Sequence, residues 1–315
     1  MNAKKVAFLF PGQGSQSVGM GLDFYNNFAI ARQTFEEADE ALGFSLSKLC
    51  FEGPDEQLRL TENTQPAIFT VSIAAQRVLT EHGVTPSYVA GHSLGEYSAN
   101  VAAGTISFAD AVRTVRSRGR YMQEAVPAGE GAMAAILSMD AGDVLKVCKD
   151  AAAETGAIVA AANINSPSQI AVSGATIAVE RAMVLAKERG ARKAVMLAVS
   201  APFHCPLMQP AQDRLAELLN ALPFAPAAVP VVVNVDAALV TDPEALRDAL
   251  IRQVTGTVRW VESMQLLIAQ KPDFFLEVGP GKVLSGLLRQ IDREQKHAHV
   301  QDSATLCHAI DMSKK

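Results

Sequence analysis

Hydrophobic and polar positions along this chain follow two spacings, which predict two kinds of secondary structure. Short, unbroken apolar runs that end at Gly or Pro are typical of buried strands, and apolar residues recurring every three or four positions are typical of amphipathic helices. The first run, 6–10, ends at Pro11 and Gly12, and the first helical pattern begins near Phe28. Strands and helices alternate from there, which predicts an α/β fold with a parallel sheet.

The two spacings assign most of the chain to elements. The predicted strands are 6–10, 87–91, 133–137, 157–163, 168–174, 193–199, 229–235 and 273–279. The predicted helices are 28–44, 61–82, 94–103, 108–125, 141–154, 177–189, 243–254, 260–270, 283–291 and 304–310, with one more after Pro206. The tail after Asp292 is polar, and we expect only the last of these helices in it.

The middle of the chain has a different order of elements from its two ends. From Gly131 the pattern is β-α-β-β-α-β, entered through the Gly- and Pro-rich segment 127–131. This order is typical of the split, ferredoxin-like arrangement. We therefore predict a small inserted domain at 129–198, within a large domain formed by 1–128 and 199–315.

Composition and charge exclude several classes of protein. The 315 residues are 49% hydrophobic, with a net charge of -5, which suits a large core and disfavours nucleic-acid binding. Four cysteines lie far apart without a C-x-x-C, so we expect no zinc site and no disulfide framework. No apolar run is long enough for a membrane helix or a signal-peptide core. We expect a cytoplasmic protein that binds neither membranes nor nucleic acid.

The segment "YVAGHSLGEYSA" at 88–99 contains a G-x-S-x-G pattern around Ser93. A strand precedes it and a helix follows it, which is the context of a nucleophile elbow, where a strained turn exposes the serine hydroxyl. The helix N-terminus behind that turn offers N–H groups to a developing oxyanion. The alternative is a Gly-rich turn that carries no chemistry.

A nucleophilic serine needs a base, and the chain has six histidines. His204 lies in the apolar loop "SAPFHCP" after a predicted strand, the end of an α/β sheet where active sites form. A structural, hydrogen-bonded histidine is the alternative. His92 adjoins the serine and is expected to shape the turn. The other four are expected on the solvent-exposed surface: His82, His297, His299 and His308.

Two further features complete a candidate site. The loop "PGQGSQ" after the first strand places Gln13 where a second oxyanion donor is expected, and it lacks a nucleotide-binding motif. Arg118 borders the apolar stripe of the 108–125 helix, so it points towards a core. A buried guanidinium requires an anion, which is either a substrate carboxylate or an internal Asp or Glu.

Six motifs in this order resemble malonyl-CoA:acyl carrier protein transacylases from Val6 to about Leu306. They are "FPGQGSQ", "GHSLGEYSA", "RSRGRYMQ", "NINSPSQIAVSG", "SAPFHCP" and "LEVGPGKVLSGL". The resemblance implies an α/β-hydrolase-like large domain with a ferredoxin-like insert. It also implies malonyl transfer from malonyl-CoA to an acyl carrier protein thiol, for fatty-acid or polyketide synthesis.

The resemblance also implies the roles of individual residues. Ser93 corresponds to the nucleophile and His204 to the base, which the backbone carbonyl of Gln253 orients in place of a carboxylate. The N–H groups of Gln13 and Leu94 correspond to the oxyanion hole. Residues that would bind substrate are Arg118, which holds the malonyl carboxylate, Asn165, Phe203 and His92. Gly256 and Thr257 depart from the family's usual Ser and Pro.

The resemblance implies no cofactor and no metal, because the coenzyme A thioester is itself the activated substrate. We expect a monomer whose partners are malonyl-CoA and an acyl carrier protein. Two alternatives stay open from the residues: a serine acyl hydrolase or thioesterase on a related core, and a non-catalytic subunit that binds the carrier. The hydrolase would normally need an acidic partner for its histidine, and none lies near "SAPFHCP".

Overall fold

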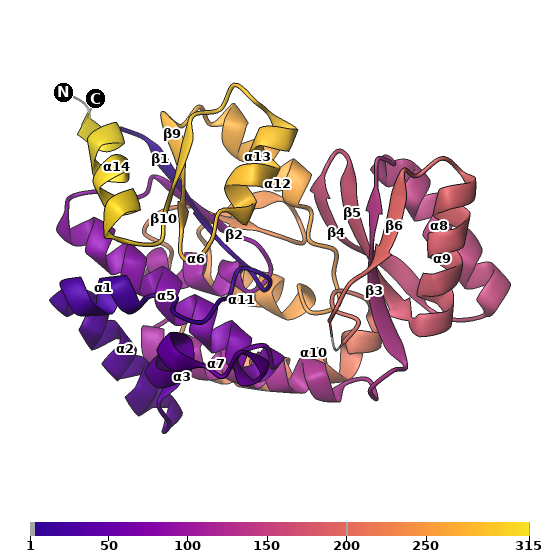
Figure 1. Cartoon of the computed structure of the whole chain (residues 1–315), viewed down its shortest axis with the longest axis horizontal. Helices are drawn as coiled ribbons and strands as arrows, with labels where there is room; N and C mark the ends of the chain where they lie inside the picture. The colour runs from indigo at the N-terminus through magenta and orange to yellow at the C-terminus, as the bar shows by residue number, and fades with distance from the viewer. Residues whose placement is uncertain (1–3, 200, 315) are drawn as a thin grey trace.

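The computed structural model describes residues 4–199 and 201–314, and it contains two β-sheets. The larger sheet is formed by β1 (Val6–Phe10), β2 (Tyr88–Gly91), β7 (Val231–Val233), β8 (Ala238–Val240), β9 (Phe274–Val278) and β10 (His297–Val300). The smaller sheet is formed by β3 (Gly131–Leu137), β4 (Val159–Ser166), β5 (Gln169–Ala175) and β6 (Lys193–Met196). Figure 1 shows the smaller sheet beside the larger body, packed on helices of its own.

The helices divide between the same two bodies (Figure 1). Those of the larger body are α1 (Leu22–Asn27), α2 (Ala29–Leu42), α3 (Leu46–Glu52), α4 (Asp55–Leu58), α5 (Thr61–Glu81), α6 (Gly95–Ala102), α7 (Phe108–Glu124), α10 (Gln209–Ala221), α11 (Pro243–Arg252), α12 (Trp260–Ala269), α13 (Val283–Ile291) and α14 (Ser303–Lys314). Those of the smaller body are α8 (Ala141–Thr155) and α9 (Thr176–Glu188). A 3-10 turn, η1 (Pro206–Met208), precedes α10.

The larger sheet runs in the order β10-β9-β1-β2-β7-β8, parallel except for β8. Helices cover both faces, so the central strands are apolar on both sides, as the unbroken run 6–10 predicted. Along β1, Phe8 and Phe10 join the main core cluster, and Ala7 and Leu9 join a second cluster around Trp260. The parallel α/β core is confirmed.

The smaller sheet is antiparallel, in the order β4-β5-β3-β6, and its chain order β-α-β-β-α-β is the predicted ferredoxin-like one. One face packs on α8 and α9 through Ile136 and Val172. Strand β4 is joined to the larger body, because Val258 N–H donates to Ala162 O (2.8 Å) and receives Ile164 N–H at its own carbonyl (2.9 Å). The insert boundaries at 129 and 198 remain predictions.

The sequence reading missed several short elements: α1, α3, α4, β8 and β10. The tail was expected to be polar with exposed histidines, but 297–300 pairs in parallel with β9 and buries Ala298 and Val300. Polar and apolar residues alternate over only four positions here, between polar neighbours, and so short a pattern does not predict a strand. Strand β7 is also shorter than the predicted 229–235, because Asn234 leaves the ladder and donates its N–H to the side chain of Glu96 (2.9 Å).

The turn from β2 to α6 is the tightest part of the larger body. Ser93 has a φ of 51°, in the left-handed region that non-glycine residues rarely occupy. A Cβ atom on Gly91 would overlap the backbone of Gly95, and one on Gly95 would overlap the carbonyl of Phe10. Strand, turn and helix therefore approach one another only because both positions are glycine.

We predict that Gly91→Ala destabilises the protein by at least about 3 kcal/mol, because backbone atoms rather than flexible side chains must move. Gly286→Ala in α13 is the matched control, since its Cβ would have open space, and it should be neutral or stabilising by up to about 1 kcal/mol. Chemical unfolding of both variants measures the difference. Equal stabilities would contradict this account of the turn.

Candidate active site

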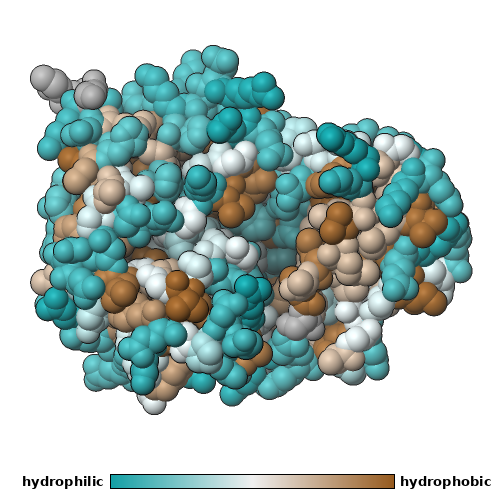
Figure 2. All heavy atoms as spheres, viewed as in Figure 1, coloured by the Kyte–Doolittle hydropathy of each residue, from teal (hydrophilic) through white to brown (hydrophobic). Residues whose placement is uncertain are grey.

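A cavity of about 180 Å³ opens where the carboxyl ends of β1 and β2 face the small domain. Figure 2 shows this face of the molecule hollowed between the two bodies. Eight of the predicted site residues line the cavity: Gln13, His92, Ser93, Leu94, Arg118, Asn165, Phe203 and His204. The ninth, Gln253, is fully buried and hydrogen-bonded to three of them.

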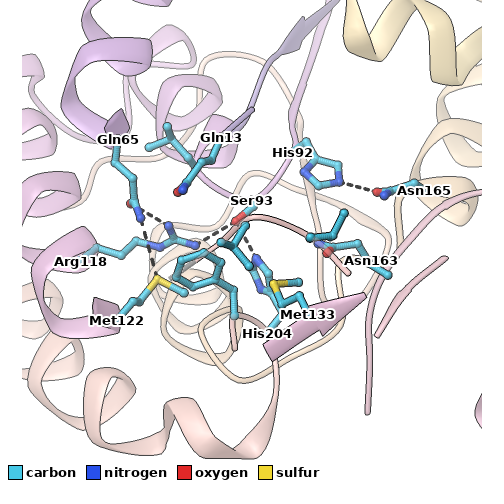
Figure 3. A pocket seen from close by; sticks show the side chains of 15 residues that line it. Gln13, Gln65, His92, Ser93, Arg118, Met122, Met133, Asn163, Asn165 and His204 are labelled. Atoms are coloured by element: carbon cyan, nitrogen blue, oxygen red, sulfur yellow. Dashed lines mark hydrogen bonds between the residues drawn. The ribbon is translucent and has the colours of Figure 1, made fainter. Parts of the chain in front are cut away.

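A chain of hydrogen bonds joins Ser93, His204 and Gln253 (Figure 3 shows the first two). Ser93 Oγ lies 2.6 Å from His204 Nε2, and His204 Nδ1 lies 2.9 Å from the backbone carbonyl of Gln253. A carbonyl oxygen can only accept, so Nδ1 carries the proton and Nε2 is left to accept from the serine hydroxyl. The serine is thus oriented towards a base that is already in the correct tautomer.

Burial keeps the His204 imidazole neutral. It is 3% exposed, and desolvation, followed by the positive charge of Arg118, lowers its pKa to about 3. The hydrogen bond to Gln253 acts in the opposite direction. At neutral pH the ring therefore carries a proton on Nδ1 only, and Nε2 is free to accept a second one.

The guanidinium of Arg118 reaches the same point from α7 (Figure 3). One terminal nitrogen donates to Gln65 Oε1 (2.7 Å), and the other donates to Ser93 Oγ (3.0 Å) and Gln253 Oε1 (2.9 Å). Within residues 4–199 and 201–314, no carboxylate lies at ion-pair distance from Arg118. The internal salt bridge considered from the sequence is absent there, and the buried cation faces the cavity with neutral partners.

His92 was expected to shape the turn and, from the resemblance, to bind substrate. Its side chain lines the cavity, on the side opposite Arg118 (Figure 3). Its Nε2 lies 2.7 Å from Oδ1 of Asn165 on β4. This hydrogen bond joins the larger body to the smaller one. The ring packs edge-on against Trp260, with centroids 5.4 Å apart. Burial lowers the pKa of His92, which favours a neutral ring that donates to the amide oxygen.

The candidate oxyanion donors belong to two different elements. Gln13 lies in the loop after β1, and Leu94 is the N-cap residue of α6. Both line the cavity beside Ser93, where the α6 N-terminus adds partial positive charge. Phe203 lines the same cavity next to His204, whose φ of 58° is also left-handed.

Four polar residues in or beside the site were missed from the sequence: Gln65, Glu96, Asn163 and Asn234. Asn234 Oδ1 accepts the Ser93 N–H (2.7 Å), and Asn234 Nδ2 donates to Gly91 O (2.7 Å). All of them are buried, where a polar side chain is costly unless it finds hydrogen-bond partners. Only Asn234 carried a clear sequence signal, because it directly follows the apolar run of β7.

Neither a metal centre nor a membrane span was found in the part of the chain that the structure describes. No three or more His, Cys, Asp or Glu side chains there are grouped so that they could hold a metal ion. None of its helices combines the length and the apolarity needed to cross a membrane.

Comparison with known proteins places this site in a family. Residues 7–308 match the acyl transferase domain. A curated relative, the malonyl CoA-acyl carrier protein transacylase of Bacillus subtilis, is 52% identical over 99% of this chain and 98% of its own length. The enzyme of the same name from Escherichia coli K12 is 47% identical over 97% of this chain and 99% of its own.

Solved structures agree over the whole fold. The malonyl CoA-acyl carrier protein transacylase of Coxiella burnetii superposes with a TM-score of 0.96 at 41% identity, covering 99% of both chains. A malonyl-transacylase solved in complex with its type II PKS acyl-carrier protein gives 0.95 at 46% identity, covering 98% of this chain and 99% of that one. This chain therefore belongs to the acyl transferase domain family, among the malonyl CoA-acyl carrier protein transacylases.

Proposed function

We propose that this protein transfers a malonyl group from malonyl-CoA to the phosphopantetheine thiol of an acyl carrier protein, through an ester on Ser93. One observation carries the assignment of the site. The Ser93 hydroxyl lies within hydrogen-bond distance of both a neutral histidine, His204 (2.6 Å), and a buried guanidinium, Arg118 (3.0 Å), that has no carboxylate partner among the residues which the structure describes. The first arrangement suits acyl transfer, and the second suits an acyl group that carries an acid.

In the first half-reaction, His204 Nε2 takes the Ser93 proton as the serine oxygen attacks the thioester carbonyl. The negative charge on the former carbonyl oxygen is stabilised by the N–H groups of Gln13 and Leu94. When the C–S bond breaks, coenzyme A leaves as a thiolate and receives the proton from His204. The products are free coenzyme A and a malonyl ester on Ser93, with His204 neutral again.

In the second half-reaction, the carrier thiol takes the place of coenzyme A. His204 removes the thiol proton, the thiolate attacks the ester carbonyl, and the Ser93 oxygen leaves and is reprotonated by His204. The Gln253 carbonyl, 2.9 Å from Nδ1, supports the imidazolium that forms twice in each cycle. No cofactor is required, because the thioester already supplies the activated acyl group.

Arg118 is proposed to hold the malonyl carboxylate. A guanidinium can donate two parallel hydrogen bonds to a carboxylate, and burial strengthens that attraction. Its present acceptors, Gln65, Gln253 and Ser93, are all neutral, so a substrate carboxylate competes with them favourably. Malonyl is thereby preferred over acetyl, which has no second carboxyl.

Several properties are proposed on the strength of the relatives. The structure of a malonyl-transacylase with a type II PKS acyl-carrier protein supports a carrier protein as second substrate, in fatty-acid or polyketide synthesis. We further propose that the protein acts as a monomer in the cytoplasm, without a cofactor. A hydrolase is disfavoured, because His204 Nδ1 bonds to a backbone carbonyl and not to a carboxylate.

We predict that Ser93→Ala accepts no malonyl group, because the attacking hydroxyl is gone while the turn retains its shape. Intact-protein mass after mixing with malonyl-CoA should increase by one malonyl group in the wild type and not at all in the variant. Peptide mapping should place the group on Ser93. A malonylated Ser93→Ala protein would refute the assignment.

We predict that His204→Ala slows acyl loading by a factor on the order of 10² to 10⁴, as expected for a lost general base. Because the pKa of His204 is lowered to about 3, wild-type loading should not collapse as pH falls through 6.5, the usual histidine value, but only at lower pH. Stopped-flow loading rates across pH test this. A variant at the wild-type rate would transfer the base role to another residue.

We predict that Arg118→Ala reduces malonyl loading on the order of 10²-fold relative to acetyl loading, since only malonyl presents a carboxylate. Arg118→Lys should restore little, because an ammonium cannot form two parallel bonds. The measurement is the ratio of kcat/KM for malonyl-CoA to that for acetyl-CoA. Equal losses with the two donors would assign Arg118 a purely structural role.

A further inference from the structure

Glu96 is a buried carboxyl group that the proposed reaction does not use. It lies in the first turn of α6, three residues after Ser93, and its side chain is inaccessible to solvent. Its Oε2 accepts the backbone N–H of Asn234 (2.9 Å) and the side-chain amide of Gln253 (2.8 Å). Its Oε1 has no hydrogen-bond partner among the described residues. Burying a carboxyl group costs free energy, so its presence here indicates a compensating structural or functional role.

The two partners of Glu96 hold both the proposed nucleophile and its base. Asn234 accepts the Ser93 N–H and so fixes one side of the strained turn. The Gln253 amide donates to Ser93 O (2.9 Å) on the other side, and its backbone carbonyl orients His204. One carboxylate oxygen therefore fixes the two side chains on which the nucleophile and its base depend.

The same amide stands between Glu96 and Arg118. Gln253 donates from Nε2 to Glu96 and accepts at Oε1 from the guanidinium (2.9 Å), so its two ends match the two charges. The anion and the cation are thus linked through one neutral group without touching. A direct ion pair would occupy the guanidinium nitrogens that the substrate carboxylate needs.

We propose that Glu96 is the counter-charge of Arg118 and the positioning residue for Ser93 and His204, acting through Gln253 and Asn234. It reduces the cost of burying the guanidinium in the empty site and still leaves it available to an acidic acyl group. It also opposes that acyl group electrostatically, which limits how tightly the malonyl ester is held before transfer. This inference rests on the proposed malonyl transfer.

Burial also places the titration of Glu96 near neutrality. Desolvation raises its pKa to about 7, while the bonds from Gln253 and Asn234 and the charge of Arg118 act against the rise. Two other titratable groups interact with it electrostatically, Tyr97 on α6 and Asp236 after β7, and Asp236 is paired with Arg252 on α11. Glu96 is therefore mainly ionised at pH 8 and mainly protonated at pH 6.

Two substitutions separate its two roles. Glu96→Gln keeps an oxygen for Asn234 and Gln253 and places its amide nitrogen where Oε1 has no partner, so only the charge is lost. Glu96→Asp keeps the charge but is one methylene shorter and cannot hold both partners in their present geometry. Asp39→Asn is the matched control, because it removes a carboxylate that accepts the Ser47 N–H (2.9 Å) on α3, away from the cavity.

The measured quantity is the ratio of kcat/KM for loading from malonyl-CoA to that from acetyl-CoA, at pH 8. Glu96→Gln should raise this ratio on the order of tenfold, because the malonyl carboxylate no longer meets a buried anion. Glu96→Asp should slow both donors by up to about 10²-fold and leave the ratio unchanged, as expected for misplaced reacting groups. Asp39→Asn should match the wild type in both rates.

The pH dependence provides a readout that a merely structural residue would not change. In the wild type the ratio should rise as pH falls from 8 to 6, since protonation of Glu96 removes the opposing charge. Taking the ratio cancels protonation of His204, which affects both donors. In Glu96→Gln the ratio should stay flat over this range, because an ordinary malonyl carboxylate remains ionised throughout.

The outcomes decide between the roles. A wild-type ratio and a wild-type pH dependence in Glu96→Gln would overturn the counter-charge, and wild-type rates in Glu96→Asp would overturn the positioning role. If Glu96→Asp does not fold in a thermal melt, the Glu96→Gln ratio and its pH dependence still decide the proposal. A wild-type protein that forms no malonyl ester would instead refute the proposed function, so the two failures are distinguishable.

Discussion

The site depends on keeping the Arg118 guanidinium buried and charged while no carboxylate of the described residues is bound to it. A lone cation in an apolar interior is strongly disfavoured, so the surrounding residues must compensate for its lost hydration. Here neutral acceptors from three separate segments do so: the amides of Gln65 and Gln253 and the hydroxyl of Ser93. These acceptors also fix the position of the serine, so the cation and the nucleophile are positioned together.

The fold explains how these segments meet. The loops after β1 and β2 contribute Gln13 and Ser93 at one edge of the parallel sheet, where α/β proteins commonly bind ligands. The other wall of the cavity belongs to the inserted sheet, which contributes Asn165 from β4. Backbone hydrogen bonds between β4 and Val258 join the two bodies. Contacts within this one chain therefore set the distance between the two walls of the cavity.

The sequence predicted those site residues that lie within a recognisable local pattern. A strand, a G-x-S-x-G and a helix are contiguous, so Ser93 could be found directly, and the apolar loop around His204 was distinctive. The bonds of Glu96 to Asn234 and Gln253, and of Gln253 to Ser93, could not be predicted from spacing, because they join residues that lie 138 to 160 positions apart in the sequence. Strand β10 was missed because its stability comes from pairing with β9, which no local pattern records.

The most direct test of the account is the structure of the malonyl-enzyme trapped on wild-type protein in the absence of a carrier. The account predicts an ester on Ser93 whose free carboxylate accepts two hydrogen bonds from Arg118, in place of the present contacts to Ser93 and Gln253. The carbonyl oxygen of the ester should point towards the N–H groups of Gln13 and Leu94. A malonyl carboxylate directed into solvent, with Arg118 still bonded to its neutral partners, would contradict the account.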